Sequence, residues 1–206
     1  MNLIFIMKEK KKKLNLMDKI DSITELKNPS FVKPILINYT QKNIQKKWEA
    51  VISHNSVSIL LWHRQKDAFV IVKQLRPAVL NMTKTDGMMH ELCAGIIDKN
   101  VSDVQIAKEE IAEECGFDVP VENLKYITTF YTSVGISGAS QILYYAELDD
   151  SMKIDEGGGL QEEEIEVVYV PTKDAKKFIF DESYKKTPGM MMAFYWFFDN
   201  LRHSRT

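Results

Sequence analysis

GIIDKNVSDVQIAKEEIAEECGF, residues 95–117, holds four glutamates within six positions. At about 100° per residue, Glu110, Glu113 and Glu114 fall on one face of a helix, directly after Glu109. Acids at these spacings repel one another by roughly a few tenths of a kcal/mol per pair, so a bound cation would stabilise the cluster. Oxygen ligands favour the hard cations Mg²⁺ and Mn²⁺ over zinc. An acidic, solvated helix face is the alternative interpretation.

The same segment carries the start and stop signals of a helix. Ser102 suits the N-cap position, and Gln105 three residues later completes a capping pair. Gly116 suits the left-handed residue that ends a helix. The apolar residues recur at spacings of 3, 4 and 4 and form one stripe: Val104, Ala107, Ile111 and Cys115. We therefore expect a helix over residues 102–116 whose apolar stripe anchors it while the acids project together.

The composition of the whole chain is that of a globular protein. Its 206 residues, 45% hydrophobic and 27% charged, suit one large domain, alone or with a small appendage. No apolar run approaches the roughly 18 residues of a membrane-spanning helix. A net charge of −2 gives no electrostatic reason to expect a nucleic acid as partner, and we expect no membrane partner either. Cys93 and Cys115 are the only cysteines, which excludes a disulfide framework and suits a reducing compartment.

Apolar segments outside the acidic helix predict a mainly β architecture. A loop is expected over residues 83–89 and a final helix over 188–201, with a proline in its first turn. Strands alternating with two substantial helices indicate an α/β or α+β layered domain. The expected strands cover residues 31–39, 47–52, 56–62, 68–75, 124–132, 141–147 and 165–170, with a short strand entering a loop over 90–97.

The first 16 residues differ from the rest of the chain. A short apolar patch is followed by lysines at positions 8 and 10–13. The patch is too short for a signal peptide, and in a signal peptide the charges precede the apolar run. We interpret residues 1–16 as a flexible, basic tail; a weak membrane or nucleic-acid contact through its lysines is the alternative.

The spacing within residues 95–117 resembles the signature of the Nudix hydrolases, Gly-x5-Glu-x7-Arg-Glu-hydrophobic-x-Glu-Glu-x-Gly-hydrophobic. Two positions depart from it: Val101 replaces the first signature glutamate, and Glu109 replaces the arginine. In the family that arginine orients the neighbouring metal-binding carboxylates, so Glu109 leaves the role unfilled. The matching positions are Gly95, Glu110, Ile111, Glu113, Glu114, Gly116 and Phe117.

Four further segments, residues 73–79, 91–95, 133–138 and 157–167, resemble the branch of Nudix hydrolases that cleave UDP-sugars. The resemblance covers about residues 17–200. It implies a Nudix fold, a mixed β-sheet sandwiched between helices, with an N-terminal β extension. We accordingly divide the chain into the tail (1–16), a β extension that serves dimerisation (17–55) and the Nudix hydrolase domain (56–203).

The activity implied by this resemblance is Mg²⁺-dependent hydrolysis of a nucleoside diphosphate sugar, most simply UDP-glucose to UMP and glucose 1-phosphate. Mn²⁺ is a possible substitute for Mg²⁺, and a cytoplasmic homodimer is implied. A diphosphate suits metal catalysis because metal ions can bridge its oxygens and activate water. There are two alternatives. One is hydrolysis of ADP-ribose. The other is nucleotide binding with little turnover, which Glu109 in place of the signature arginine would explain.

The resemblance also assigns residues to the site. It implies metal ligation by the carbonyl of Ala94 and by Glu110, Glu113 and Glu114. A further glutamate on a mobile loop orients or deprotonates water, and the loop at residues 157–164 has three glycines that make it flexible. Its acids include Glu162 and Glu163, and an acidic surface loop is the alternative. We favour Glu163 because it would point away from its neighbours in an extended segment.

Three more residues are candidates for substrate binding. Arg76 follows a buried strand, where its guanidinium could fork onto phosphate or stack on uracil; a surface salt bridge is the alternative. Gly135 and Ser137 lie in a loop that could approach the sugar or phosphate with backbone N–H groups, or form an ordinary hairpin turn. The four histidines show no paired metal-ligand spacing, and Trp48 belongs to the expected dimerisation segment.

Overall fold

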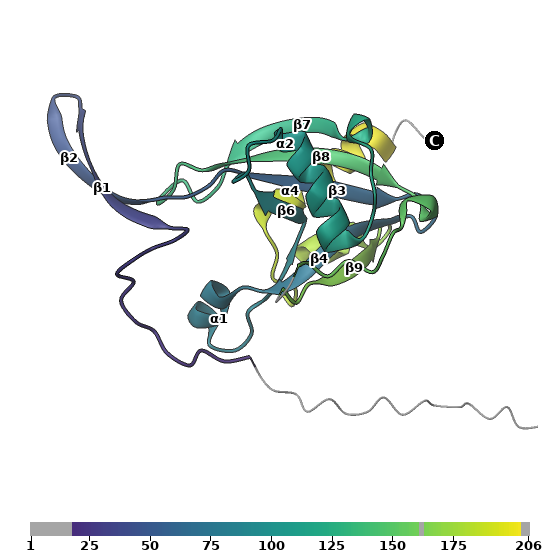
Figure 1. Ribbon diagram of the computed structural model, residues 1–206, viewed down its shortest axis with the longest axis horizontal. Helices are drawn as coiled ribbons and strands as arrows, with labels where there is room; N and C mark the ends of the chain where they lie inside the picture. Colours follow the sequence, from purple (N-terminus) through teal and green to yellow (C-terminus); the bar gives the residue numbers. More distant parts are fainter. Residues whose placement is uncertain (1–17, 161–162, 203–206) are drawn as a thin grey trace, which may run out of the picture.

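A computed structural model describes residues 18–160 and 163–202 of the chain (Figure 1). The expected tail at residues 1–16 and the candidate Glu162 lie outside the described residues. A seven-stranded mixed sheet forms the body, in the order β5-β4-β3-β8-β7, with β6 also paired to β3 and β9 to β4. Its strands are β3 (Ser56–His63), β4 (Ala68–Leu75), β5 (Met88–Glu91), β6 (Cys93–Ile96), β7 (Lys125–Tyr131), β8 (Ser140–Leu148) and β9 (Glu166–Pro171).

Helices cover both faces of this sheet, as the sequence predicts. The helices are α1 (Pro77–Thr83), α2 (Asp103–Glu110), α3 (Ala175–Phe180) and α4 (Pro188–Phe197). Strands β3 and β8 run parallel, and the other pairs of the body sheet are antiparallel. A mixed sheet between helices confirms the predicted fold class.

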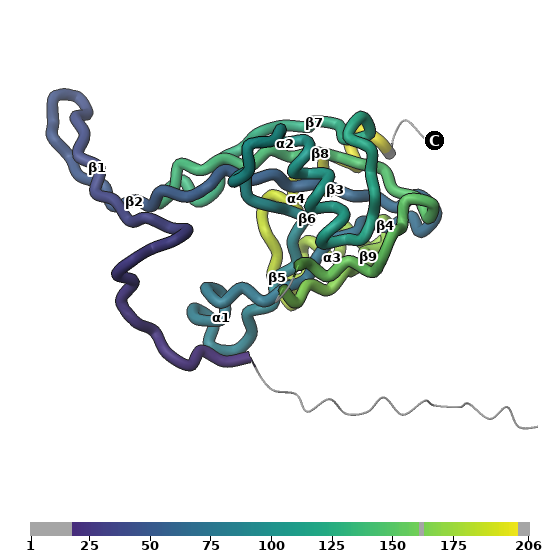
Figure 2. The backbone as a smooth tube through the Cα atoms, in the orientation of Figure 1, coloured from purple at the N-terminus to yellow at the C-terminus, as the bar shows by residue number. Residues whose placement is uncertain are grey.

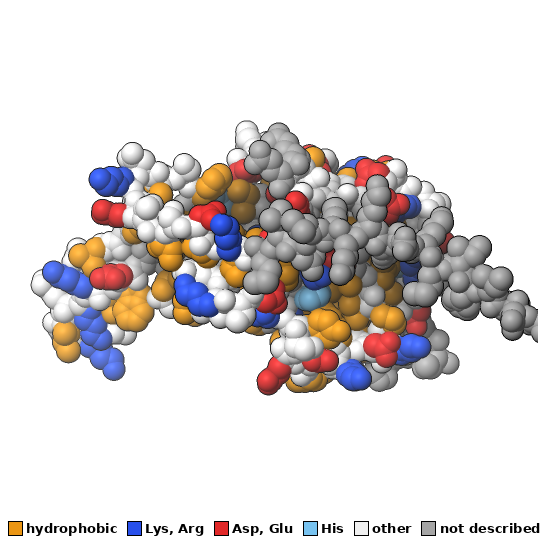
Figure 3. All heavy atoms as spheres, turned by 90° about the horizontal axis from the view of Figure 1, so that it is seen from below, with side chains coloured by type: hydrophobic (Ala, Val, Ile, Leu, Met, Phe, Trp, Pro, Cys, Tyr) orange, Lys and Arg blue, Asp and Glu red, His pale blue; other side chains and the backbone are white. Residues whose placement is uncertain are grey.

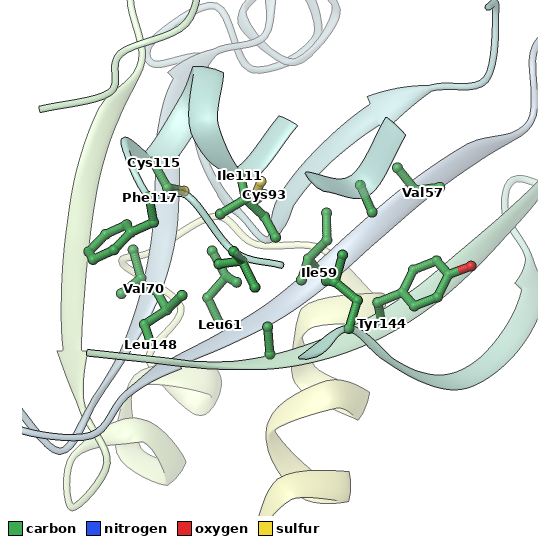
Figure 4. Close-up of a cluster of buried hydrophobic side chains, with 14 of the residues drawn as sticks. Val57, Ile59, Leu61, Val70, Cys93, Ile111, Cys115, Phe117, Tyr144 and Leu148 are labelled. Carbon is green, nitrogen blue, oxygen red and sulfur yellow. The ribbon is translucent and has the colours of Figure 1, made fainter. Parts of the chain in front are cut away.

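Strand β3 shows how one segment serves two cores. Successive side chains of a strand point to opposite faces. Val57, Ile59 and Leu61 accordingly join the cluster under α2, which Figure 4 shows, while Leu60 and Trp62 join the cluster under α3 and α4. Burial on both faces accounts for the nearly continuous apolar sequence of this strand.

The aromatic run of the last helix fills the second cluster. The rings of Phe69 and Phe194 stack with centroids 4.1 Å apart, and Phe197 meets Phe69 edge-on at 4.9 Å. These residues are core residues, as the sequence suggests. The expected helix over residues 188–201 is α4 followed by a π turn at Phe198–Arg202.

The N-terminal extension is a hairpin of β1 (Lys33–Gln41) and β2 (Ile44–Ile52), which stands away from the body sheet in Figures 1 and 2. Strand β1 is as long as predicted but shifted by two residues, and β2 is longer than predicted, because the turn contains only Lys42 and Asn43. Both have positive φ, 53° and 62°, as a two-residue hairpin turn requires. The polar residues on either side, read as a break in the sequence, continue the ladder instead.

Two short helices and one strand were not predicted. Residues 83–89 are not a continuous loop, because β5 begins at Met88, and α1 precedes it. Helix α1 has seven residues and buries only Leu80, so it shows no apolar period that a sequence reading could detect. Helix α3 is equally short. Short 3₁₀ turns occur at Val121–Asn123 and Asp150–Met152. None of the described helices has the length and apolarity needed to span a membrane.

Candidate active site

The acidic helix begins where the sequence predicts and ends in a wider turn. The hydroxyl of Ser102 accepts a hydrogen bond from the backbone N–H of Gln105 at 3.4 Å. The expected capping pair is only half formed, because the Gln105 side chain donates to Glu109 at 3.1 Å instead. After α2, a π turn at Ile111–Cys115 carries Glu113 and Glu114, and Gly116 ends it at φ 70°. Such π turns occur often at functional sites.

Strand β6 and this helix approach each other at a glycine. A Cβ atom on Gly95 would lie 1.9 Å from Oε1 of Glu110, so no other residue fits without displacing that acid. Glu114 is only 6% exposed, and its Oε2 accepts a hydrogen bond from the N–H of Ala94 at 3.0 Å. The N–H and C=O of a strand residue point to the same edge, so the Ala94 carbonyl also lies toward Glu114. The structure thus brings together Ala94, Glu110 and Glu114.

Burial makes both acids hard to ionise. Burial raises the pKa of Glu114 to about 8, opposed by the Ala94 N–H and reinforced by the charge of Glu110. Burial also raises the pKa of Glu110 to about 7, with the charge of Glu113 adding to it. Neither acid forms an ion pair with a lysine or arginine among the described residues. The result is a buried acid pair that lacks a compensating positive charge.

The glycine-rich loop closes over the end of this helix. The N–H groups of Gly158 and Gly159 donate to the carbonyls of Glu114 and Glu113, each at 3.0 Å. All three glycines have positive φ, and a Cβ on Gly157 would lie 2.4 Å from the Glu114 carbonyl oxygen. From the sequence, these glycines are expected to make the loop flexible. The structure gives a different reason, since they permit close docking of the loop on the helix end.

This docked loop carries Glu163 toward the acid pair. The charge of Glu163 contributes to the raised pKa of both Glu110 and Glu114. The Glu163 N–H donates to the Leu160 carbonyl at 3.0 Å, and Oε2 of Glu163 accepts from the Leu160 N–H at 2.9 Å. The sequence argument for the direction of Glu163 involves Glu162, which lies outside the described residues, so it stays a prediction.

The donor set suits a divalent cation shared with a substrate. No group of three or more histidine, cysteine, aspartate or glutamate side chains is arranged to hold a metal ion in the part of the chain that the structure describes. Mg²⁺, however, commonly takes only one or two protein carboxylates and completes its shell with water and substrate phosphate oxygens. The buried pair Glu110 and Glu114, short of positive charge, fits this mode.

Glu109, at the position of the signature arginine, forms an ion pair with a lysine. Its Oε2 lies 2.9 Å from Nζ of Lys99, and its Oε1 accepts from Gln105. The hydrogen bond from Lys99 lowers the pKa of Glu109. Val101, at the other departing position, is 46% exposed. The ion pair thus has an acid on the helix and a base on the preceding loop, and Glu109 adds no uncompensated charge to the site.

Arg76 forms a salt bridge within the chain. Its Nε and a terminal guanidinium nitrogen donate to the two oxygens of Glu91, at 2.9 and 2.6 Å. This is the alternative that the sequence left open. The hydrogen bond to Glu91 raises the pKa of Arg76, and the charges of Glu114 and Glu163 add to it. Arg76 therefore lies close enough to Glu114 for their charges to interact, although two of its guanidinium N–H groups are bonded to Glu91.

Gly135 and Ser137 do not join the acid pair in the described structure. The carbonyl of Gly135 accepts from the indole N–H of Trp48 at 2.9 Å, and the hydroxyl of Ser137 accepts from the N–H of Ala139. The N–H of Val51 donates to the Ile136 carbonyl at 2.7 Å. This loop holds the base of the hairpin, and the sequence-based assignment of Gly135 and Ser137 to substrate contacts stays a prediction.

A cavity of about 520 Å³, which the sequence did not reveal, opens beside the acid pair. It extends from Glu91 and Ala94 to the end of β7 and the first turn of α4. Ser58 and Gln141 contribute polar groups to it. The one hint of this cavity in the sequence is Ser58, a polar residue within the otherwise apolar run of β3.

Comparison with known proteins gives named relatives. No protein-family model matches this chain. Uridine diphosphate glucose pyrophosphatase NUDT14 of Bos taurus is 34% identical over 196 residues, which cover 82% of this chain and 88% of the relative. The protein of the same name in Mus musculus is 32% identical, covering 90% and 97%. GDP-mannose pyrophosphatase of Cronobacter sakazakii is 37% identical over 134 residues, covering 64% and 68%.

The substitution Glu114→Gln should stabilise the metal-free protein at alkaline pH. Since the folded pKa of Glu114, about 8, exceeds its usual 4.5, the wild type loses stability as pH rises through that interval, whereas glutamine has no charge to bury. In EDTA at pH 8.5 we expect the variant to melt about 10 °C higher, with the difference vanishing toward pH 5. Glu122→Gln, an exposed acid, is the control. A pH-independent difference would contradict the burial argument.

The substitution Glu109→Arg should weaken the site. It places a second cation beside Lys99 and removes the acceptor of Gln105, so catalytic efficiency is expected to fall about three- to tenfold. Adding Lys99→Glu restores an ion pair of the opposite polarity and should recover most of the loss. Steady-state kinetics of the two single variants and the double variant measure this coupling. Additive effects would show that the pair does not act as a unit.

Proposed function

The chain belongs to the Nudix hydrolase family, and on that premise we propose that it hydrolyses the diphosphate bond of nucleoside diphosphate sugars, UDP-glucose giving UMP and glucose 1-phosphate. The relatives named above are pyrophosphatases of UDP-glucose and GDP-mannose. The observation that carries the proposal is the buried acid pair of Glu110 and Glu114, whose missing positive charge a metal-bound diphosphate would complete.

Each part of the site has a role in this reaction. Glu110, Glu114 and the Ala94 carbonyl would hold Mg²⁺, or Mn²⁺, with Glu113 beside them. The bound ion would offset the charge of the diphosphate and make water more acidic. Glu163, on the docked loop, would orient the attacking water and accept its proton as the water oxygen bonds to phosphorus and the bridging P–O bond breaks.

Two basic residues near the pair are already bound to acids. Arg76 is forked onto Glu91, and the charges of Glu114 and Glu163 also act on it, so the positive charge that an anionic substrate needs would come from the bound metal ion. Lys99 neutralises Glu109, so the replacement of the signature arginine adds no net charge beside the acid pair. Nucleotide binding with little turnover stays an alternative, because no cation takes over the orienting role of that arginine among the described contacts of Glu109. Hydrolysis of ADP-ribose remains the second activity to test.

We also propose that the chain is a homodimer. One face of the hairpin is apolar and exposed: Ile37 faces Trp48 across the strands, at 41% and 52% exposure. Hydrophobic side chains beside lysines cover the hairpin end of the molecule, at the left of Figure 3. An isolated two-stranded hairpin is marginally stable in water, so a second copy would cover this face. The two free, buried thiols suit a cytoplasmic location.

A panel of UDP-glucose, GDP-mannose and ADP-ribose, with Mg²⁺ or with EDTA, tests the activity. We expect release of UMP that requires the metal, and a kcat about 100-fold lower or more in Glu163→Gln, because a proton acceptor is lost. The melting temperature should not change, since the amide oxygen of glutamine can still accept from the Leu160 N–H. The control is Glu164→Gln. Equal rates in the two variants would exclude Glu163 as the base, and no hydrolysis of any substrate would refute the proposed function.

Sedimentation equilibrium tests the dimer. The wild type should sediment at twice the chain mass, and Ile37→Glu should shift it to the monomer, because a charge cannot be buried unpaired in an apolar interface. Asn38→Glu, on the polar face of the same strand, is the matched control and should remain dimeric. A wild-type monomer, or dissociation by both variants alike, would contradict an interface on this face.

A further inference from the structure

We propose that the cavity beside the acid pair binds the nucleotide base and recognises its carbonyl–N–H edge, the edge that uracil and guanine share. This inference rests on the proposed function, and it specifies which half of the substrate enters the cavity and which groups select it. Ser58 and Gln141 are the residues assigned to this recognition.

The cavity is continuous with the site of chemistry. Ala94, whose N–H binds Glu114, is also part of the cavity wall, as is Glu91, the partner of Arg76. A substrate with its diphosphate at Glu114 would therefore place one of its two ends in the cavity. A volume of about 520 Å³ is sufficient for a nucleoside or a hexose, so the chemistry of the walls must decide between them.

The walls favour a base over a hexose. Phe130, Pro188, Met190 and Met192 supply apolar and aromatic surface, which exceeds the polar surface of the walls. Besides Ser58 and Gln141, the polar residues of the walls include Glu91, Thr132, Ser133 and Thr187. A base has two apolar faces and one polar edge, which such a cavity can match. A hexose carries hydroxyl groups around its whole ring, and burying them against apolar walls would leave them without partners.

Ser58 is a buried hydroxyl without a partner. Its side chain is 2% exposed, and its Oγ forms no hydrogen bond in the described structure. Because side chains alternate along β3, Ser58 faces the α4 side of the sheet together with Leu60, and so points into the cavity. Buried polar atoms are nearly always satisfied, so this hydroxyl is a donor that a ligand carbonyl would complete.

Gln141 supplies the complementary acceptor. Its Nε2 donates to the hydroxyl of Ser56 at 3.1 Å, which fixes the amide. Its Oε1 then points to the first turn of α4, 3.5 Å from the position of a Cβ on Gly189. A fixed acceptor and a free hydroxyl match a ring N–H next to a carbonyl if Gln141 faces the ring nitrogen and Ser58 the exocyclic oxygen. In that arrangement cytosine and adenine would direct an accepting ring nitrogen at the Gln141 acceptor, which leaves both without a proton to share.

UDP-glucose and CDP-glucose test this directly, since they differ only at that edge. We expect wild-type kcat/KM to favour UDP-glucose at least about tenfold, because a site built to bond an N–H rejects the analogue lacking it. Gln141→Met, similar in size but without the acceptor, should bring the ratio near one, mainly through KM. Ser58→Ala should raise KM for UDP-glucose about fivefold at nearly constant kcat. Ser140→Ala, on the opposite face of β8, is the control.

A structural role for Ser58 predicts a different result. Because its hydroxyl has no partner to lose, Ser58→Ala should leave the melting temperature unchanged or higher. A lower melting temperature with unchanged KM would overturn the assignment. A loss of discrimination between UDP-glucose and UDP-galactose, with the uracil-to-cytosine ratio intact, would place the hexose in the cavity and also overturn it.

Binding without turnover separates this inference from the proposed function. Calorimetric titration of UMP and CMP in EDTA requires no hydrolysis. UMP should bind at least about tenfold more tightly than CMP, and Gln141→Met should abolish the difference. If no nucleotide sugar is hydrolysed but UMP is preferred, the proposed function fails and base recognition stands. Equal affinities for UMP and CMP would refute base recognition whatever the enzyme activity.

Discussion

Two glutamates held out of water at the crossing of a helix and a strand determine how the rest of this site is built. Glu110 lies so close to β6 that any residue larger than glycine at position 95 would displace its side chain, and Glu114 is almost completely buried. Removal from water disfavours both charges and raises both pKa values. The backbone must approach these acids closely from several directions, and glycines occur at the contacts: Gly95 on the strand and Gly157 on the loop.

Two basic residues near the pair are bound to other acids. Arg76 pairs with Glu91, and Lys99 pairs with Glu109. Each base neutralises an acid beside the site without reaching Glu110 or Glu114. A cation can therefore bind where the protein supplies negative charge and phosphate supplies the remaining oxygens. The cavity at Ala94 then gives the substrate a continuous path from the reacting bond to the base.

The sequence predicts best those features that depend on residues close together in the chain. Over residues 102–116 the Ser102 cap, the apolar stripe and the terminal glycine act as expected, although the Gln105 side chain does not complete the capping pair. The features that the sequence does not reveal depend on distant parts of the fold. The partner of Glu109 is ten residues away on a loop, and Gly135 bonds to Trp48, 87 residues away. The direction of Glu163 depends on how its loop docks, which no spacing encodes. The cavity forms from segments of β3, β7, β8 and α4 that only the sheet order brings together.

The number of protons released when Mg²⁺ binds tests most directly whether the buried pair is the metal site. Calorimetric titration at pH 7 in buffers of different ionisation enthalpy measures this number. With pKa values of about 7 and 8, Glu110 and Glu114 together hold roughly one to two protons in the metal-free protein, which ligation must expel. We predict release of that many protons per ion at pH 7 and almost none at pH 9.5. Tight binding with no proton release at pH 7 would contradict a metal site formed by these two acids.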